Sequence, residues 1–176
     1  MKFKVLLLIY IFINSCNGLR EKKENTSNAK EVVVLGSILN SYQSIKPLAV
    51  SNDSSGLEKK YRIVAYYNGD CGVCYLQLFK WKKMVQKFAS FDVDFKFILS
   101  GNSSAVIKAN LEEIGFPLEV VYHDQKDEFG KAHTFFLDRG YKNSAVLLNK
   151  KGEILLIGNP TISTDIMNNY LKFLKN

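Results

Sequence analysis

The sequence predicts an α/β fold, and two observations support this prediction. Runs of β-branched and aromatic residues alternate along the chain with segments whose apolar residues recur at the helical period. Near the carboxyl end, two apolar runs flank a polar turn, a pattern typical of a β-hairpin. The expected order is strand, helix, strand, helix, strand, hairpin and helix, which indicates a sheet whose parallel strands are connected by helices.

The first clear strand and helix carry the most informative residues. Arg62 to Tyr67 is β-rich, Asn68-Gly69-Asp70 predicts a turn, and a helix is expected from about Cys71 to Phe88. One side of this helix is an apolar stripe and the other is basic: Cys74, Leu78, Trp81, Val85 and Phe88 against Lys80, Lys83 and Lys87. Cys74 is therefore expected to point toward the core, and Cys71, at the helix start, to lie nearer solvent.

The later elements follow from the same periodicities. Asp92 to Leu99 predicts a buried parallel strand, Ser103 or Ser104 caps a helix that runs through Ile114, and Leu118 to Tyr122 predicts a further strand. The segment 124–140 is mixed in pattern, with room for a short helix.

The hairpin and the last helix complete the chain. Residues 145–148 and 153–157 are expected to pair across the turn 149–152, and Ser163 or Thr164 caps a helix that ends at Leu174. Residues 31–60 form an extension in which Val32 to Leu35 and Lys46 to Val50 are candidate short strands and Ser51 to Gly56 is a loop by composition.

The amino-terminal segment resembles a bacterial lipoprotein signal peptide. Lys2 and Lys4 precede the apolar run Val5 to Ile13, which is too short for a bilayer span of about 20 residues. The resemblance implies cleavage after residue 15 and lipidation of Cys16, so we expect a signal peptide (1–15), a lipidated amino terminus with a flexible tether (16–30) and one domain (31–176). The alternative is an ordinary cleaved signal without a lipid, which would release the domain as a soluble protein of the envelope.

Composition narrows the function classes. The formal charge of the chain is +7, and removal of residues 1–15 would take away Lys2 and Lys4 and leave +5. The lysines are scattered along the chain, so nucleic acid is not an expected partner. No phosphate-binding glycine loop and no ordered hydrolase triad is present. No organic cofactor and no resident metal are expected.

Cys71 and Cys74 form a Cys-Gly-Val-Cys motif where a predicted strand gives way to a predicted helix. A thiolate at a helix amino terminus is stabilised by unpaired backbone N–H groups and by the helix dipole, so the pKa of such a thiol falls. The first thiol is then able to attack a disulfide near neutral pH, and the second to resolve the mixed disulfide. A purely structural disulfide is the alternative, but so short a loop gains little stability from closure.

The motif and the hairpin sequence Ser144-Ala-Val-Leu-Leu-Asn-Lys-Lys-Gly-Glu-Ile-Leu155 resemble the thioredoxin-like superfamily, in particular the exported TlpA-like or ResA-like thiol-disulfide proteins. The resemblance covers about residues 61–176. It implies a three-layer α/β/α sandwich around a central mixed β-sheet, with Cys71 as the nucleophile and Cys74 as the resolving thiol.

Three positions depart from the family pattern. Asp70 stands where a tryptophan is usual, and a carboxylate beside Cys71 is expected to oppose thiolate formation. Asn143 occupies the position of the family's cis-proline, and we expect a trans peptide there because a non-proline cis bond costs about 2.5–4 kcal/mol. Ala65 stands where thioredoxin itself has a buried acid, so a carboxylate proton relay is missing or is supplied by another element.

The leading hypothesis is a membrane-anchored thiol-disulfide oxidoreductase of the bacterial cell envelope, acting on protein thiols or disulfides. One alternative is a noncatalytic interaction domain that keeps the scaffold. Another is a carrier of copper or a similar soft metal, since thiolates select such ions. A zinc site made of Cys71, Cys74, His123 and His133 matches no compact ligand spacing. The sequence does not distinguish reductase, oxidant and isomerase.

Overall fold

The computed structural model describes residues 45–49, 59–137 and 140–175. The predicted signal peptide and tether, the lipidation residue Cys16, the candidate strand Val32 to Leu35 and the loop Ser51 to Gly56 all lie outside these residues. Within the described ranges, no helix is both long and apolar enough to cross a bilayer.

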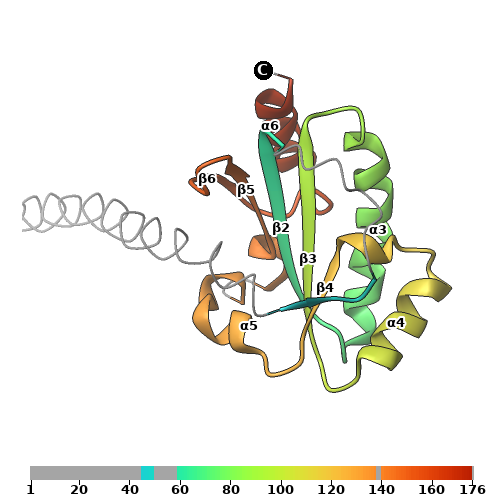
Figure 1. Cartoon of the computed structure of the whole chain (residues 1–176). Helices are drawn as coiled ribbons and strands as arrows, with labels where there is room; N and C mark the ends of the chain where they lie inside the picture. The colour runs from blue at the N-terminus through green and yellow to red at the C-terminus, as the bar shows by residue number, and fades with distance from the viewer. Residues whose placement is uncertain (1–44, 50–58, 138–139, 176) are drawn as a thin grey trace, which may run out of the picture. The chain divides into compact units, whose positions relative to one another are not determined.

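A six-stranded mixed sheet forms the centre of the molecule, in the order β1-β4-β3-β2-β5-β6 (Figure 1). The strands are β1 (Lys46–Pro47), β2 (Tyr61–Asn68), β3 (Val93–Ser100), β4 (Val121–Asp124), β5 (Ala145–Asn149) and β6 (Ile154–Ile157). β2, β3 and β4 are parallel to one another, whereas β1, β5 and β6 each pair antiparallel with their neighbours. The mixed sheet expected from the sequence is therefore confirmed.

Helices cover both faces of the sheet. In the described ranges the α-helices are α3 (Gly72–Phe88), α4 (Ser104–Glu113), α5 (Glu128–Ala132) and α6 (Thr164–Leu174). The short 3₁₀ helices there are η2 (Leu118–Val120), η3 (Thr134–Phe136) and η4 (Gly140–Asn143). The crossovers β2-α3-β3 and β3-α4-β4 step along the sheet in the same direction, so right-handed connections put α3 and α4 on the same face. Figure 1 shows α5 on the other side of the strands.

Two apolar cores, one on each face, confirm the three-layer sandwich. The first joins β2, β3 and β5 to α3, α4 and α6, and its fully buried members include Ile63, Leu78, Trp81, Phe97, Leu111 and Tyr170. The second joins the opposite side of the same strands to α5 and η3, and includes Val64, Ile98, Phe129, Phe136 and Val146. Alternate residues of β2 enter different cores, as the two-residue period of a strand requires.

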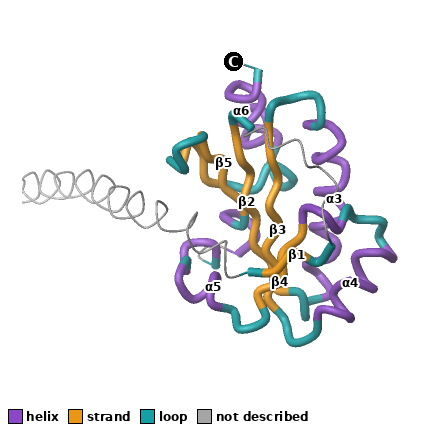
Figure 2. Tube along the Cα trace, viewed as in Figure 1, coloured by secondary structure: helices purple, strands orange, loops and turns teal. Residues whose placement is uncertain are grey.

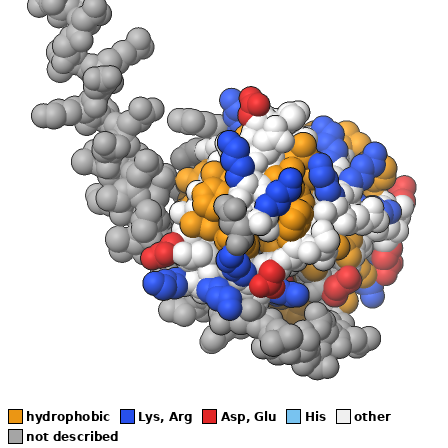
Figure 3. Space-filling view, turned by 90° about the horizontal axis from the view of Figure 1, so that it is seen from above, with side chains coloured by type: hydrophobic (Ala, Val, Ile, Leu, Met, Phe, Trp, Pro, Cys, Tyr) orange, Lys and Arg blue, Asp and Glu red, His pale blue; other side chains and the backbone are white. Residues whose placement is uncertain are grey.

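The helix that follows the cysteine motif has the predicted faces. Cys74, Leu78, Trp81 and Phe88 are buried, and Val85 packs partly buried against the same core. Lys80, Lys83 and Lys87 are exposed on the opposite side. Seen from above, lysine and arginine side chains are interspersed with hydrophobic and neutral ones across the visible surface (Figure 3).

The predicted serine caps are present. Ser103 Oγ accepts a hydrogen bond from Val106 N at 3.4 Å, and Ser163 Oγ accepts one from Asp165 N at 3.2 Å. Each cap satisfies a backbone N–H that the first helical turn leaves without a partner. Gly115 ends α4 with a φ of +61°, a left-handed conformation that favours glycine.

The structure corrects two strand predictions. The strand expected at Leu118 to Tyr122 begins three residues later, because η2 follows Pro117 and the ladder with β3 begins only at Val121. The strand expected from Lys46 is the two-residue β1, paired at the sheet edge with β4 (Figure 2). The described residues of the segment 124–140 form the short helices α5 and η3, and η4 begins at Gly140.

Candidate functional site

The two cysteines lie where the central strand β2 leads into α3. Cys71 is the N-cap residue of α3, in an extended conformation, and Cys74 lies in the first turn. Asn68 shapes the connection, since its carbonyl accepts from Cys71 N at 3.3 Å and its side chain accepts from Asp70 N at 2.8 Å. The strand end and the helix start together fix the position of the Cys71 sulfur at the carboxyl edge of the parallel strands.

Burial distinguishes the two thiols, as the helical stripe predicts. Cys71 is partly exposed, whereas Cys74 is 3% exposed and belongs to the apolar core shared with α3. Both are free thiols. An external disulfide is therefore able to reach the Cys71 sulfur more readily than the Cys74 sulfur.

The pKa values of the two thiols shift in opposite directions. Hydrogen bonds from the Cys74 thiol and the Tyr141 hydroxyl lower the pKa of Cys71, and backbone N–H groups of the first turn contribute in the same direction. Burial, followed by the interaction with Cys71, raises the pKa of Cys74 to about 11. Cys71 is thus the thiol that ionises first and Cys74 the one that stays protonated.

Tyr141 contacts both sulfurs. Its hydroxyl lies 3.6 Å from Cys71 Sγ and 3.7 Å from Cys74 Sγ. The ring stacks against that of Tyr67, with centroids 6.4 Å apart. Sequence reasoning missed this residue, which belongs to η4 and lies 70 positions from Cys71. One signal in the sequence points to Tyr141: it lies two residues before Asn143, which occupies the position of the family's cis-proline.

A buried polar cluster lies behind the thiols. The Tyr67 hydroxyl accepts hydrogen bonds from Trp81 Nε1 at 2.7 Å and from Asn159 Nδ2 at 2.9 Å, and the Ser144 hydroxyl lies 3.1 Å from it. Ser144 also donates to the Tyr141 carbonyl at 2.9 Å. These neutral groups thus find their hydrogen-bond partners within the core. The bond from Ser144 to the Tyr141 carbonyl also holds the η4 backbone, and with it Tyr141, beside the cysteines.

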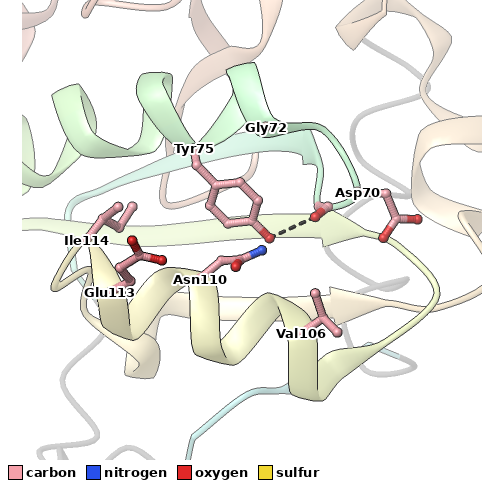
Figure 4. A pocket seen from close by; sticks show the side chains of 8 residues that line it. Asp70, Gly72, Tyr75, Val106, Asn110, Glu113 and Ile114 are labelled. Atoms are coloured by element: carbon pink, nitrogen blue, oxygen red, sulfur yellow. Dashed lines mark hydrogen bonds between the residues drawn. The ribbon is translucent and has the colours of Figure 1, made fainter.

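The Asp70 carboxylate, expected to oppose thiolate formation at Cys71, is held by the loop that leads into α4. It accepts hydrogen bonds from the backbone and side chain of Asn102, at 3.3 and 3.0 Å. Figure 4 shows Asp70 at the end of a groove between α3 and α4, near the loop that leads into α4. The pKa of Cys71 is lowered in spite of this neighbour, because hydrogen bonds from Cys74 and Tyr141 favour the thiolate.

The other two departures are visible in the backbone. Ala65 is fully buried between Phe97 and Ala145 of the adjacent strands, so this position holds no proton-transfer group. Asn143 ends η4, just before Ser144 and β5. Among the described residues no peptide bond is cis, which agrees with the trans peptide expected at Asn143.

A cavity of about 550 Å³ opens beside the cysteines. It crosses the carboxyl ends of β2 and β3 and reaches the α5 and η3 side of the sheet. Its lining residues come from four parts of the chain: the end of β2 and the start of α3 (Tyr66, Tyr67, Asn68, Cys71 and Cys74); the end of β3 (Ser100); the segment 127–137 (Asp127, Phe136 and Leu137); and η4 with the residue after it (Gly140, Tyr141 and Ser144). Crevices at the carboxyl ends of parallel strands are the usual ligand sites of α/β sheets.

The histidines do not join the cysteines. His123 Nε2 lies 2.8 Å from the Gly101 carbonyl. His133 is buried against the Phe129 ring, and neither of its ring nitrogens has a hydrogen-bond partner among the described residues. Over the described ranges, no three cysteine, histidine or acidic side chains form a group able to hold a metal ion. The four-ligand zinc alternative is therefore not supported.

Comparison with known proteins identifies the fold. No protein-family model matches the chain, and no curated protein matches its sequence. Among solved structures, the chain is similar to the thioredoxin domain of a thiol-disulfide oxidoreductase from Bacteroides vulgatus (17% identity, 69% of this chain and 84% of that one, TM-score 0.52). It is also similar to a thioredoxin-like protein from Parabacteroides distasonis (16% identity, 65% and 81%, TM-score 0.52) and to a thiol:disulfide interchange protein from Bacteroides sp. (19%, 68% and 76%, TM-score 0.50). The chain thus has a thioredoxin-like fold.

Proposed function

We propose that this protein is a thiol-disulfide oxidoreductase in which Cys71 is the attacking thiol and Cys74 the resolving thiol. The observation that carries the proposal is the asymmetry of the pair. Cys71 is partly exposed at the start of α3 with a lowered pKa, and Cys74 is buried one turn away with a raised pKa. The structural neighbours whose names describe thiol-disulfide exchange have the same fold.

The first half of the reaction uses the exposed thiolate. Cys71 attacks one sulfur of a substrate disulfide, an S–S bond forms between Cys71 and that sulfur, and the other substrate sulfur leaves as a thiolate. The Tyr141 hydroxyl, 3.6 Å from Cys71 Sγ, stabilises the negative charge before the attack. No organic cofactor takes part in this step.

The second half requires Cys74 to ionise. Interaction with Cys71 is one cause of the raised pKa of Cys74, and this cause disappears when the Cys71 thiolate becomes part of the mixed disulfide. The Tyr141 hydroxyl remains beside Cys74 and favours its thiolate. Cys74 loses its proton to solvent, its thiolate attacks Cys71 Sγ, the bond to the substrate breaks, and the second substrate sulfur leaves as a thiolate. Two electrons pass to the substrate, and a thiol reductant restores the pair; the reverse sequence oxidises a substrate dithiol.

The proposed location is the bacterial cell envelope, with the domain tethered to a membrane by a lipid on Cys16 and facing the periplasm or the cell exterior. The support is the signal-like sequence of residues 1–15, the cysteine that follows it and the polar segment up to Lys30. Envelope proteins that carry thiols or disulfides would be the partners. Metabolic labelling with a fatty-acid analogue tests the anchor: the wild-type chain should be labelled and a Cys16→Ala chain should not.

Trapping the mixed disulfide tests the exchange reaction. In the full chain, Cys74→Ser should accumulate mixed disulfides with envelope proteins, because the resolving thiolate is absent. Cys71→Ser should accumulate none, since the other thiol of the pair, Cys74, is buried and Cys16 is the proposed site of the lipid. Wild-type protein should also reduce a model protein disulfide catalytically in the presence of dithiothreitol. A Cys74→Ser chain that traps nothing, together with wild-type protein that reduces no disulfide, would favour the noncatalytic interaction domain.

A further inference from the structure

The cavity beside Cys71 has an aromatic wall and one carboxylate. Tyr66, Phe136 and Leu137 line the side away from α3, and Asp127 projects from the turn before α5. Leu137 is 54% exposed, so the wall continues to the surface. None of the described lining residues is a lysine, arginine or histidine. A cavity of about 550 Å³ lies within the usual size of a ligand site, about 300–1,000 Å³.

The backbone around Asp127 is built to present its carboxylate to the cavity. Asp127 has a φ of +55°, the one positive φ among described residues other than glycine. The neighbouring Asp124 supplies the capping bonds of α5, because its carboxylate accepts from Glu128 N at 3.0 Å and Phe129 N at 2.8 Å. Asp127 makes no capping bond and instead accepts a hydrogen bond from the Tyr66 hydroxyl.

Gly130 makes this approach feasible. A Cβ at residue 130 would collide with both the Tyr66 hydroxyl and Asp127 Oδ1, so a side chain there would displace the pair. The Tyr66 hydroxyl is held from its other side by Ser100 Oγ at 3.0 Å. The Asp127 oxygen that faces Tyr66 is therefore fixed, and its second oxygen, Oδ2, has no hydrogen-bond or ion-pair partner in the part of the chain that the structure describes.

The two lysines nearest Asp127 in the sequence make their described contacts with other groups. Lys126 lies 3.9 Å from Glu128 in an ion pair, and Lys131 donates to the Lys126 carbonyl at 2.8 Å. The cavity consequently combines a negative charge with aromatic rings, and both attract a cation. The opening also contains the partly exposed Cys71 sulfur.

We propose that this cavity binds a cationic side chain, lysine or arginine, that flanks the reacting cysteine of the substrate. The inference rests on the proposed function, because the substrate is bound while Cys71 exchanges disulfides with it. The cationic group pairs with Asp127 Oδ2 and packs its methylene stem against Phe136 and Leu137. Chemistry at the sulfurs is unchanged: the substrate S–S bond breaks, the Cys71 mixed disulfide forms, and the leaving thiolate departs. The preferred substrates are thus disulfides within basic sequence contexts.

The test uses symmetrical disulfides of acetyl-X-Cys-X-amide in which X is Lys, Gln or Glu. Reduced full-length protein is mixed with each peptide, and the loss of the Cys71 thiol is followed by mass spectrometry. Each rate is divided by the rate of the same peptide with dithiothreitol, which removes differences in intrinsic disulfide reactivity. The wild-type protein should prefer the Lys peptide over the Glu peptide by about tenfold, with the Gln peptide between them.

Two isosteric variants separate a local effect from overall charge. Asp127→Asn keeps an oxygen for Tyr66 and tolerates the left-handed backbone, and it should reduce the preference to about twofold or less. Asp70→Asn makes the same change in net charge close to Cys71, but its carboxylate lies on Asn102 and outside the cavity, so the preference should remain. Circular dichroism of both variants verifies the fold.

The outcomes distinguish this inference from the proposed function. Reaction with all three peptides at similar normalised rates, or a preference that survives Asp127→Asn or disappears equally in Asp70→Asn, would overturn the cationic subsite and leave the exchange reaction intact. If the wild-type protein reacts with none of the three peptides and also fails to reduce the model protein disulfide in the presence of dithiothreitol, both the exchange reaction and the subsite are overturned.

Discussion

Replacing Tyr141 with phenylalanine tests the role assigned to its hydroxyl. The substitution removes one oxygen whose described partners are the sulfurs of Cys71 and Cys74, at 3.6 and 3.7 Å. The ring and its stacking on Tyr67 are retained. We expect the pKa of Cys71 to rise, because the thiolate loses a donor while the protonated thiol loses little.

The size of the shift follows from the geometry. A hydrogen bond to a charged group contributes about 1.5–3 kcal/mol at good geometry. The Cys71–Tyr141 contact is long and Cys71 is partly exposed, so solvent screening reduces this to about 0.7–1.4 kcal/mol. Since one pKa unit corresponds to about 1.36 kcal/mol, the expected increase is about half a unit to one unit. The pKa of Cys74, about 11 in the wild type, should rise as well.

Alkylation of reduced protein measures this shift. The rate at which iodoacetamide modifies Cys71 is followed from pH 5 to 10 by peptide mass spectrometry, and its midpoint gives the pKa of the thiol. Tyr75→Phe is the matched control, because the Tyr75 hydroxyl is one turn from Cys71 but donates to the Gly69 carbonyl at 2.7 Å (Figure 4). An unchanged midpoint in Tyr141→Phe, or an equal shift in Tyr75→Phe, would refute the assignment.

Three further predictions concern stability, measured as the free energy of unfolding in urea. Burial lowers the pKa of His133 below its ordinary 6.5. As the pH drops below 6.5, the unfolded chain therefore binds a proton before the native protein does, and the free energy of unfolding decreases. In His133→Leu this decrease should be smaller. Trp81→Phe removes the indole donor to Tyr67 and should cost about 1–3 kcal/mol, whereas no loss would show that the buried hydroxyl needs no such partner. Gly130→Ala should cost about 1–3 kcal/mol by displacing Tyr66, and wild-type stability in this variant would contradict the close approach of Tyr66 to Gly130.

Local patterns were enough to predict the elements that surround the site. The stripe from Cys74 to Phe88 and the caps at Ser103 and Ser163 depend on neighbours within a few residues, and each is present as predicted. The start of β4 at Val121 could not be predicted in this way, because it depends on register with β3, a strand some 25 residues earlier.

The sequence by itself determined that two thiols one turn apart begin a helix, one toward solvent and one toward the core. This is so because helical period and the chemistry of a helix start are local properties. Tertiary structure decided which groups surround those thiols: Tyr141 reaches both sulfurs, Asp70 turns to Asn102, and Asp127 joins Cys71 in one cavity. The hydrogen-bonded pairs among these contacts, Asp70 with Asn102 and Cys71 with Tyr141, lie 32 and 70 positions apart in the sequence. Residues so far apart meet only when the strands of the sheet assemble.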